Sequence, residues 1–202
     1  MIYPSFFDKV EPIIMKDPLA EFLGACKEGI IEYGYTDLVK LAGHSCPTVA
    51  GAYLMSKAAL DKLYKDETPI RGEIKVELRG SLDEGVVGVI GNCISFITGA
   101  ANEGGFKGIG GNFSRNNKLF FNVKINADVR FTRLDNQKKV SVTYDPSSVP
   151  ANPRQKELMQ KIMQKTATKE DFIEFQKLWQ ERVEKILLQT PIESIITLKE
   201  EE

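Results

Sequence analysis

The sequence predicts an α+β fold in which N-terminal helices pack on a mostly antiparallel mixed sheet, followed by a C-terminal helical extension. Three observations predict it. Apolar residues recur at helical spacing over 17–63, apolar and charged residues alternate from residue 70, and helical spacing returns after residue 155. Because helices and strands occur in separate runs, the pattern is typical of α+β proteins. We therefore expect an α+β domain over 1–150 and a helical extension over 151–202.

The N-terminal helices are marked by their first residues. Asp17 followed by Pro18 suits a cap and a first helical position, and predicts a helix over 17–31 with Cys26 on its buried apolar stripe. A short helix is expected over 37–41. The segment 47–63 is rich in Ala, Leu and Met and is apolar over much of its circumference. It is therefore expected to lie centrally.

The middle of the chain has the period of strands. From 70 to 78, apolar residues alternate with charged ones, which predicts a half-buried strand. The β-branched run 85–90 predicts a second, more buried strand, and 92–100 is either a helix or an irregular turn. Five glycines make 103–112 a loop. Three further strands are expected, with a hairpin between the last two: 119–125, 129–134 and 140–144.

The C-terminal segment returns to helical spacing. An amphipathic helix is expected over 155–165, and Thr168 with Asp171 resembles a capping box for the next one. That helix carries an apolar stripe, which we expect to pack on the body or on a second copy of the chain: Phe172, Phe175, Trp179, Val183 and Ile186. The acidic end, 200–202, is expected to be frayed and solvated.

Composition excludes several classes of protein. The 202 residues, 42% hydrophobic, can bury a sizeable core in one domain. A formal net charge of -1 argues against nucleic acid or an anionic membrane as the main partner, since both select basic surfaces. No apolar run is long enough to span a bilayer, and 1–16 lacks the pattern of a signal peptide. Three cysteines cannot all pair, so we expect reduced thiols in a cytoplasmic protein.

The best functional clue is Gly43-His44-Ser45-Cys46-Pro47. In an extended segment, the single histidine of the chain and Cys46 would point to the same side. Since Pro47 suits a first helical position, Cys46 would cap the helix, where free N–H groups and the helix dipole favour the thiolate. A thiolate binds metals and attacks electrophiles. The alternative is a purely structural cap with a histidine nearby.

Cys93 is the natural third member of this site. It follows the predicted strand 85–90, from which its side chain could reach a helix terminus. One His with two Cys would suit zinc and leave a fourth position for water or substrate. Iron or heme is a variant of this hypothesis. The alternative is that Cys93 is a buried structural thiol.

The glycine-rich loop is the third candidate feature. Successive glycines expose N–H groups to an anion and Lys107 adds charge, so Lys107, Gly108 and Asn112 are candidate anion-binding or pocket residues. The loop fits neither the dinucleotide fingerprint nor the P-loop, which excludes both classes of site. A flexible loop over a pocket and a plain tight connection both remain open.

Gly-His-Ser-Cys-Pro followed by an Ala-rich helix resembles the Gly-His-x-Cys-Pro segment of the FmdE-like proteins, a family related to a component of formylmethanofuran dehydrogenase. The resemblance extends over about 34–144, where further motifs follow in the same order: Cys93, Thr98-Gly99, Phe106-Lys107-Gly108 and Gly111-Asn112. It implies an α+β fold, a homodimer and a zinc-type site that uses His44 and Cys46. The second motif departs from the family, because the family's cysteine falls nearer Val89 and its aspartate nearer Asn92.

Three functions are compatible with these residues. The first is a metal-binding protein, with zinc held by His44, Cys46 and Cys93, that acts in metal-assisted catalysis or in metal or cofactor handling. The second is a metal-independent enzyme in which Cys46 is the nucleophile, aided by His44. The third is a non-catalytic binding or assembly module. A small-molecule ligand fits the first two, and we favour the first.

Overall fold

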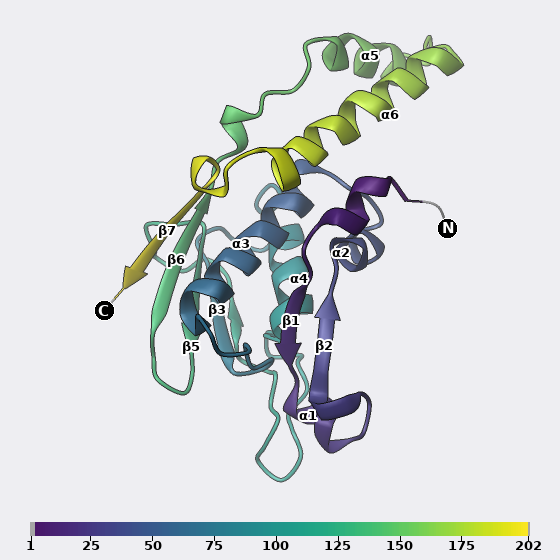
Figure 1. Cartoon of the computed structure of the whole chain (residues 1–202). Coiled ribbons are helices and arrows are strands. Elements are labelled where there is room, and N and C mark those ends of the chain that lie inside the picture. Colours follow the sequence, from purple (N-terminus) through teal and green to yellow (C-terminus); the bar gives the residue numbers. More distant parts are fainter. Residues whose placement is uncertain (1–2, 202) are drawn as a thin grey trace.

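The computed structural model describes residues 3–201, which form a sheet covered by helices, with a helical arm that projects from one end (Figure 1). The main sheet has the strand order β4-β3-β5-β6-β7. All neighbouring strands are antiparallel except β3 and β4. The α+β class and the mostly antiparallel mixed sheet are therefore confirmed. The strands of this sheet are β3 (Ile74–Leu78), β4 (Leu119–Phe120), β5 (Val129–Arg133), β6 (Lys139–Tyr144) and β7 (Ile196–Glu201).

The centre of the sheet follows the predicted alternation. Ile74, Val76 and Leu78 of β3 are buried in the core. Val76 pairs with Phe131 of β5, which in turn pairs with Val140 of β6. The hairpin between β5 and β6 is confirmed. β3, β5 and β6 each contribute alternate apolar side chains to the layer beneath the helices, and this layer fixes their register.

The helices α3 (Pro47–Tyr64) and α4 (Val87–Thr98) pack against each other and against the sheet. The central position predicted for 47–63 is confirmed, since most of α3 is buried. Gly51 lets α3 approach the sheet closely, because a Cβ at this position would collide with the ring of Tyr144. The apolar faces of α3 and α4 thus form the core, and the start of α3 is fixed relative to β6.

The prediction of a strand over 85–90 is wrong. Most of this run lies in the first turn of α4, and Cys93 is in the middle of that helix rather than at the end of a strand. A short, continuous apolar run does not distinguish a buried strand from a buried helix. The helical alternative for 92–100 is confirmed as far as Thr98. The strand expected over 119–125 is also shorter than predicted, since only Leu119 and Phe120, which form β4, pair with β3.

The prediction of a long helix over 17–31 is wrong. Asp17 does cap a helix, but α1 (Pro18–Phe22) ends after five residues. A 3-10 turn, η2 (Lys27–Gly29), then leads into β2 (Ile30–Tyr33), which pairs with β1 (Ile13–Lys16) in a two-stranded sheet. Gly24 and Gly29 both have φ of 69°, which breaks the helical path. Cys26 is half-exposed rather than buried on an apolar stripe.

The projecting arm consists of α5 (Arg154–Met163) and α6 (Lys169–Glu184), which follow the 3-10 turn η3 (Pro146–Ser148) (Figure 1). The capping box is confirmed, because the Asp171 N–H donates to Thr168 and the Thr168 N–H donates to Asp171. The predicted stripe is buried only at its end, at Val183 and at Ile186 in the π-turn η4 (Lys185–Gln189). Phe172 remains 44% exposed. The stripe therefore covers the body only near its C-terminal end.

The prediction that the acidic C-terminal end is frayed is also wrong for Glu200 and Glu201, its described residues. After the 3-10 turn η5 (Ile192–Ser194), the chain enters β7, which pairs with β6 and contains Glu200 and Glu201. The Glu201 carboxylate accepts hydrogen bonds from Arg130, at 3.2 Å, and from the Ser141 hydroxyl. These partners are distant in sequence, so local composition could not reveal the strand. Glu202 lies outside the described residues. Within residues 3–201, no helix has both the length and the apolar character needed to cross a bilayer.

Candidate functional site

The Gly-His-Ser-Cys-Pro segment connects two helices, α2 (Tyr35–Ala42) and α3. Gly43 ends α2 with φ of 74°, a left-handed conformation that glycine adopts without strain. Cys46 has extended backbone geometry and caps α3, with Pro47 as the first helical residue. Its Sγ accepts the Val49 N–H at 3.5 Å. The predicted cap is confirmed, and the Cys46 side chain, 8% exposed, lies beside the positive end of the helix dipole.

His44 is exposed, and one of its ring nitrogens is already engaged. Nδ1 lies 2.9 Å from the Ala42 carbonyl oxygen. A carbonyl can only accept, so Nδ1 carries a proton, and in the neutral imidazole Nε2 has a free lone pair. His44 lines two cavities, one on the side of α4 and one on the side of α6. The imidazole is therefore oriented by the backbone and presents an acceptor nitrogen to solvent-accessible space.

Ser45 fixes the segment and also lines the cavity on the side of α6. Its hydroxyl lies 2.9 Å from the Tyr35 hydroxyl, in the core. Its carbonyl accepts the indole N–H of Trp179 at 2.9 Å and an amide N–H of Gln180 at 3.3 Å. Both donors belong to α6. The arm thus holds the backbone between His44 and Cys46 in place.

Cys93 is buried in α4, at 1% exposure, and contributes to the wall of the cavity on that side. This cavity has a volume of about 450 Å³, and His44, Asn92 and Ser95 also line it. Burial, together with the nearby Cys46, raises the pKa of the Cys93 thiol to about 11. The structure therefore brings His44 and Cys93 to one cavity, with Cys46 near Cys93.

These groups do not form a ready coordination sphere. Within residues 3–201, no three His, Cys, Asp or Glu side chains lie close enough together to hold a metal ion. The chemistry of the donors nevertheless suits zinc, which prefers imidazole nitrogen and thiolate sulfur. The structure thus brings His44, Cys46 and Cys93 into one region of the fold, as the sequence predicts, but it does not arrange them to bind a single ion.

The glycine-rich loop lies away from this neighbourhood. It projects beside α1 in Figure 1, whereas the start of α3 is bound to α6. The loop is a tight turn in which the backbones of Ile109 and Asn112 pair, and the Phe113 ring packs 5.3 Å from that of Phe22. Lys107, Gly108 and Asn112 line neither cavity at His44. Of the two possibilities left open, the structure favours the tight connection over a cover for this site.

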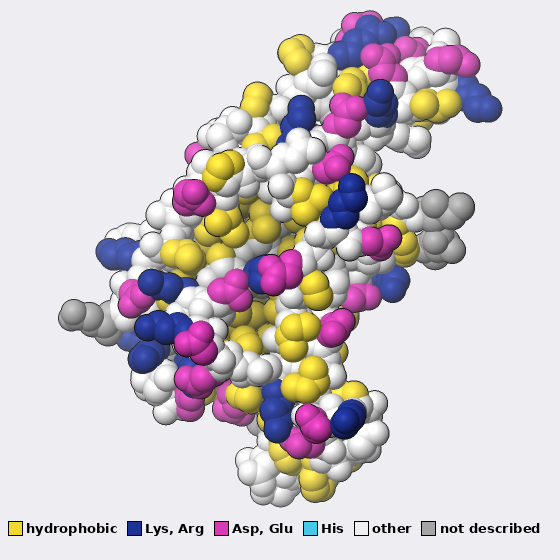
Figure 2. Space-filling view, in the orientation of Figure 1, with side chains coloured by type: hydrophobic (Ala, Val, Ile, Leu, Met, Phe, Trp, Pro, Cys, Tyr) yellow, Lys and Arg dark blue, Asp and Glu magenta, His cyan; other side chains and the backbone are white. Residues whose placement is uncertain are grey.

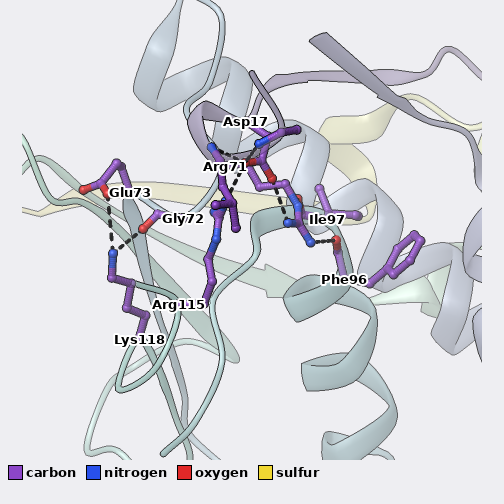
Figure 3. A network of polar contacts seen from close by, with 10 residues as sticks. Asp17, Arg71, Gly72, Glu73, Phe96, Ile97, Arg115 and Lys118 are labelled. Atoms are coloured by element: carbon purple, nitrogen blue, oxygen red, sulfur yellow. Dashed lines mark hydrogen bonds and ion pairs between the residues drawn. The ribbon is translucent and has the colours of Figure 1, made fainter. Parts of the chain in front are cut away.

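A buried ionic network that the sequence analysis missed holds the end of α4 (Figure 3). The Asp17 carboxylate accepts hydrogen bonds from Arg71 at 3.0 Å and from Arg115 at 2.6 Å. Arg71 also donates to the carbonyl oxygens of Phe96 and Ile97, in the last turn of α4. These residues are far apart in sequence, and no local pattern marks them. The network links α4, which carries Cys93, to Asp17 at the end of β1 and to Arg115 after the glycine-rich loop.

The network also sets the charge state of Asp17. Burial acts to raise the pKa of this carboxyl, but hydrogen bonds from the Ala20 N–H and Arg71, with the charge of Arg115, outweigh it and hold the pKa below its usual value. Burial lowers the pKa of Arg115. The carboxylate is therefore ionised at neutral pH and neutralises part of the charge of two guanidinium groups.

Comparison with known proteins adds one finding. The family model described as "FmdE, Molybdenum formylmethanofuran dehydrogenase operon" matches residues 41–197. The match begins just before His44 and ends inside β7, so it includes the candidate site, both helices of the core and the arm. A search of the curated proteins finds no match. Because the family match covers most of the chain, the protein belongs to the FmdE family.

Proposed function

We propose that this protein binds a transition metal ion, with zinc as the expected metal, through His44, Cys46 and Cys93. The family description refers to the operon of a molybdenum formylmethanofuran dehydrogenase. The proposed role is therefore one that accompanies this enzyme, either in metal-assisted catalysis or in handling of a metal or cofactor. A metal ion at this position would act as a Lewis acid toward a ligand in the neighbouring cavity.

The observation that carries the proposal is the hydrogen bond from His44 Nδ1 to the Ala42 carbonyl oxygen. Metal-binding histidines commonly donate their second ring nitrogen to a carbonyl or carboxylate, which fixes the tautomer and the ring orientation. Here the same arrangement leaves Nε2 free at the edge of a cavity whose wall includes Cys93. The hydrogen bond therefore selects the tautomer in which Nε2 is the nitrogen available to a metal.

The two cysteines support the proposal by their positions. Cys46 lies at the N-terminus of α3, the positive end of the helix dipole, and its Sγ accepts the Val49 N–H. Cys93 is a thiol at neutral pH, since its pKa is about 11, so metal binding would have to displace its proton. The exposed His44 side chain would also have to turn toward the two sulfurs. The proposal therefore includes a local rearrangement on binding.

Elemental analysis of purified protein by mass spectrometry tests the proposal. Wild type should carry about one metal ion per chain, and His44→Ala and Cys46→Ser should lose it. Cys93→Ser shows whether the buried thiol is the third ligand. Cys26→Ser is the matched control, because Cys26 is half-exposed and lies in a different part of the fold. The control should retain the metal of the wild type. Metal-free wild type after anaerobic purification and reconstitution would contradict the proposal.

A second candidate function is that of a metal-independent cysteine nucleophile. The specific observation in its favour is that Cys46 lies at a helix N-terminus, where its Sγ accepts a backbone N–H. His44 is the nearby base in this alternative. The two functions differ in their response to a chelator, which would abolish a metal-dependent activity and leave a thiol-dependent one unchanged.

We also propose a homodimer that forms through the arm. Met163, Phe172 and Ile173 are exposed apolar residues on α5 and α6, and the main contacts of α5 are with α6. Light scattering with size-exclusion chromatography should give twice the mass of the chain. Ile173→Glu should give the mass of one chain. A wild-type monomer at micromolar concentration would contradict the dimer, and capture of a different protein by the arm would favour the binding-module alternative.

A further inference from the structure

His44 lines a second cavity, which Cys93 does not line. It is a groove of about 650 Å³ between the N-terminal turn η1 (Ser5–Lys9), α2 and the underside of the arm. Figure 1 shows η1 directly below α6. The groove is lined mainly by aromatic and apolar side chains: Tyr3, Phe7, Val39, Met159, Phe175 and Trp179. Its polar lining comes from His44, Ser45, Gln176 and Gln180.

The aromatic rings come from two segments that are distant in sequence. On α6, the rings of Phe175 and Trp179 lie 5.6 Å apart and are inclined by 38°. On the N-terminal segment, the rings of Tyr3 and Phe7 lie 5.9 Å apart and are inclined by 30°. Each segment thus contributes a pair of rings to the same groove. Flat ligands gain both buried area and favourable ring stacking between such surfaces.

The groove contains no formal charge. None of the described residues that line it is Asp, Glu, Lys or Arg, whereas charged side chains cover the outer part of the arm (Figure 2). A charged ligand would lose water there without gaining a counter-ion, at a cost of several kcal/mol. The lining therefore selects an uncharged ligand.

One polar group of the lining has an unmet hydrogen bond. The amide nitrogen of Gln180 donates to the Ser45 carbonyl oxygen, but its Oε1 is buried and accepts no hydrogen bond from the described residues. An unpaired buried acceptor is unfavourable by about 1–3 kcal/mol. A ligand N–H donor in the groove would give this amide oxygen a partner after a small rotation of the side chain.

We propose that this groove is a binding site for an uncharged, planar aromatic molecule that carries an N–H donor, held between the two aromatic pairs with its donor directed to Gln180. The site is distinct from the cavity that Cys93 lines, and it does not depend on a bound metal. His44 lines both cavities, so a ligand in the groove would lie next to the proposed metal ligands.

The chain contains its own reporter for this site, since Trp179 is its single tryptophan. The probe is isocarbostyril, a planar, neutral, bicyclic lactam with one N–H. It should change the Trp179 emission in a saturable way, with one site per chain by titration calorimetry. The N-methyl derivative lacks the donor and should bind about three- to tenfold more weakly. Naphthoate has a similar ring system with a carboxylate and should bind more weakly still.

Two variants and one control locate the site. Phe175→Ala and Gln180→Met should each weaken isocarbostyril binding by about fivefold or more. Phe106→Ala is the control, because Phe106 is an exposed aromatic residue outside the arm and does not line the groove. The control should bind as the wild type does. Circular dichroism establishes that all three variants are folded.

Three results would overturn the proposal. The first is the absence of saturable binding to folded wild type. The second is equal binding by wild type and Phe175→Ala. The third is a groove closed by a second copy of the chain, in which case wild type binds no probe and its Trp179 emission shifts to the red on dilution. Metal content measured on the same samples separates these results from a failure of the proposed metal site, because neither Phe175 nor Gln180 is among the proposed ligands.

Discussion

The indole N–H of Trp179 donates a 2.9 Å hydrogen bond to the carbonyl oxygen of Ser45, the residue between His44 and Cys46. The two residues are 134 positions apart in the chain. The arm therefore contacts the candidate site directly, through the backbone that positions both potential ligands. A change in the arm should be measurable at the site.

Trp179→Phe should reduce the free energy of unfolding by about 1–2 kcal/mol, because it removes this hydrogen bond and part of a half-buried ring. Urea denaturation followed by circular dichroism measures the change. Phe106→Leu, at an exposed position outside the arm, should change stability by less than about 0.5 kcal/mol. Equal stability of wild type and Trp179→Phe would mean that the contact does not hold the segment.

Asp17→Asn should be one of the most destabilising single changes. The substitution keeps the shape of the side chain but leaves Arg71 and Arg115 without their shared counter-ion, and Arg115 is buried. Removing one partner of a buried ion pair typically destabilises a protein by about 3–5 kcal/mol, and the partial exposure of Arg71 places the expected value near the lower limit. Asp66→Asn, at an exposed position, is the control and should be nearly neutral in the same denaturation experiment.

The same carboxyl predicts how stability depends on pH. Because the pKa of Asp17 is lower in the folded protein than in the unfolded chain, its contribution is fully present above the unfolded pKa of about 3.9. That contribution is lost as the pH falls through the folded pKa. Wild type should therefore lose stability more steeply than Asp17→Asn below about pH 4. If the free energy of unfolding falls with pH equally steeply in the two proteins, this carboxyl does not contribute to the pH dependence.

The cysteines should differ in their rates of alkylation. Cys26 is half-exposed, whereas Cys46 and Cys93 are buried, and burial keeps Cys93 protonated at neutral pH. In metal-free protein, iodoacetamide should modify Cys26 first and Cys93 last, as measured by peptide mass spectrometry. Modification of Cys46 ahead of Cys26, unaffected by chelator, would instead support the cysteine-nucleophile function.

Gly51→Ala should destabilise the contact between α3 and β6. The added Cβ would overlap the ring of Tyr144, whose hydroxyl donates to the Pro47 carbonyl oxygen at 2.9 Å. Overpacking of this kind typically costs about 1–3 kcal/mol. Gly34→Ala is the control, because its new Cβ would make only an ordinary contact with Asp37. The midpoint of thermal denaturation should fall clearly for Gly51→Ala and by less for Gly34→Ala.

The sequence predicted correctly those features that depend on residues only a few positions apart. The caps at Asp17, Cys46 and Thr168 were predicted correctly, because each depends on residues within three positions. The alternation in β3 was also sufficient, since one face of the strand is buried by the helices. The same reasoning failed for Ile30 and Ile31, which form β2 only because β1 lies beside them.

The candidate site was predictable only in part. The cap at Cys46 and its neighbour His44 follow from a few consecutive residues, but the cavity shared by His44 and Cys93 requires the contact between α2 and α4. The run that begins at Val87 could not be assigned to a helix without that contact. The Asp17 network and the bond from Trp179 to Ser45 join residues across the whole chain, and no spacing in the sequence marks them.

Titration of metal-free, anaerobic protein with cobalt(II), followed by absorption spectroscopy, tests the metal site most directly. Cobalt(II) substitutes for zinc, and thiolate ligands add a charge-transfer band in the near ultraviolet to the intense visible bands of a tetrahedral ion. We predict that both bands saturate at one ion per chain, disappear in Cys46→Ser, weaken in Cys93→Ser and vanish when zinc is added. A weak, octahedral spectrum without a charge-transfer band, or identical spectra for wild type and Cys46→Ser, would contradict a His/Cys metal site at the start of α3.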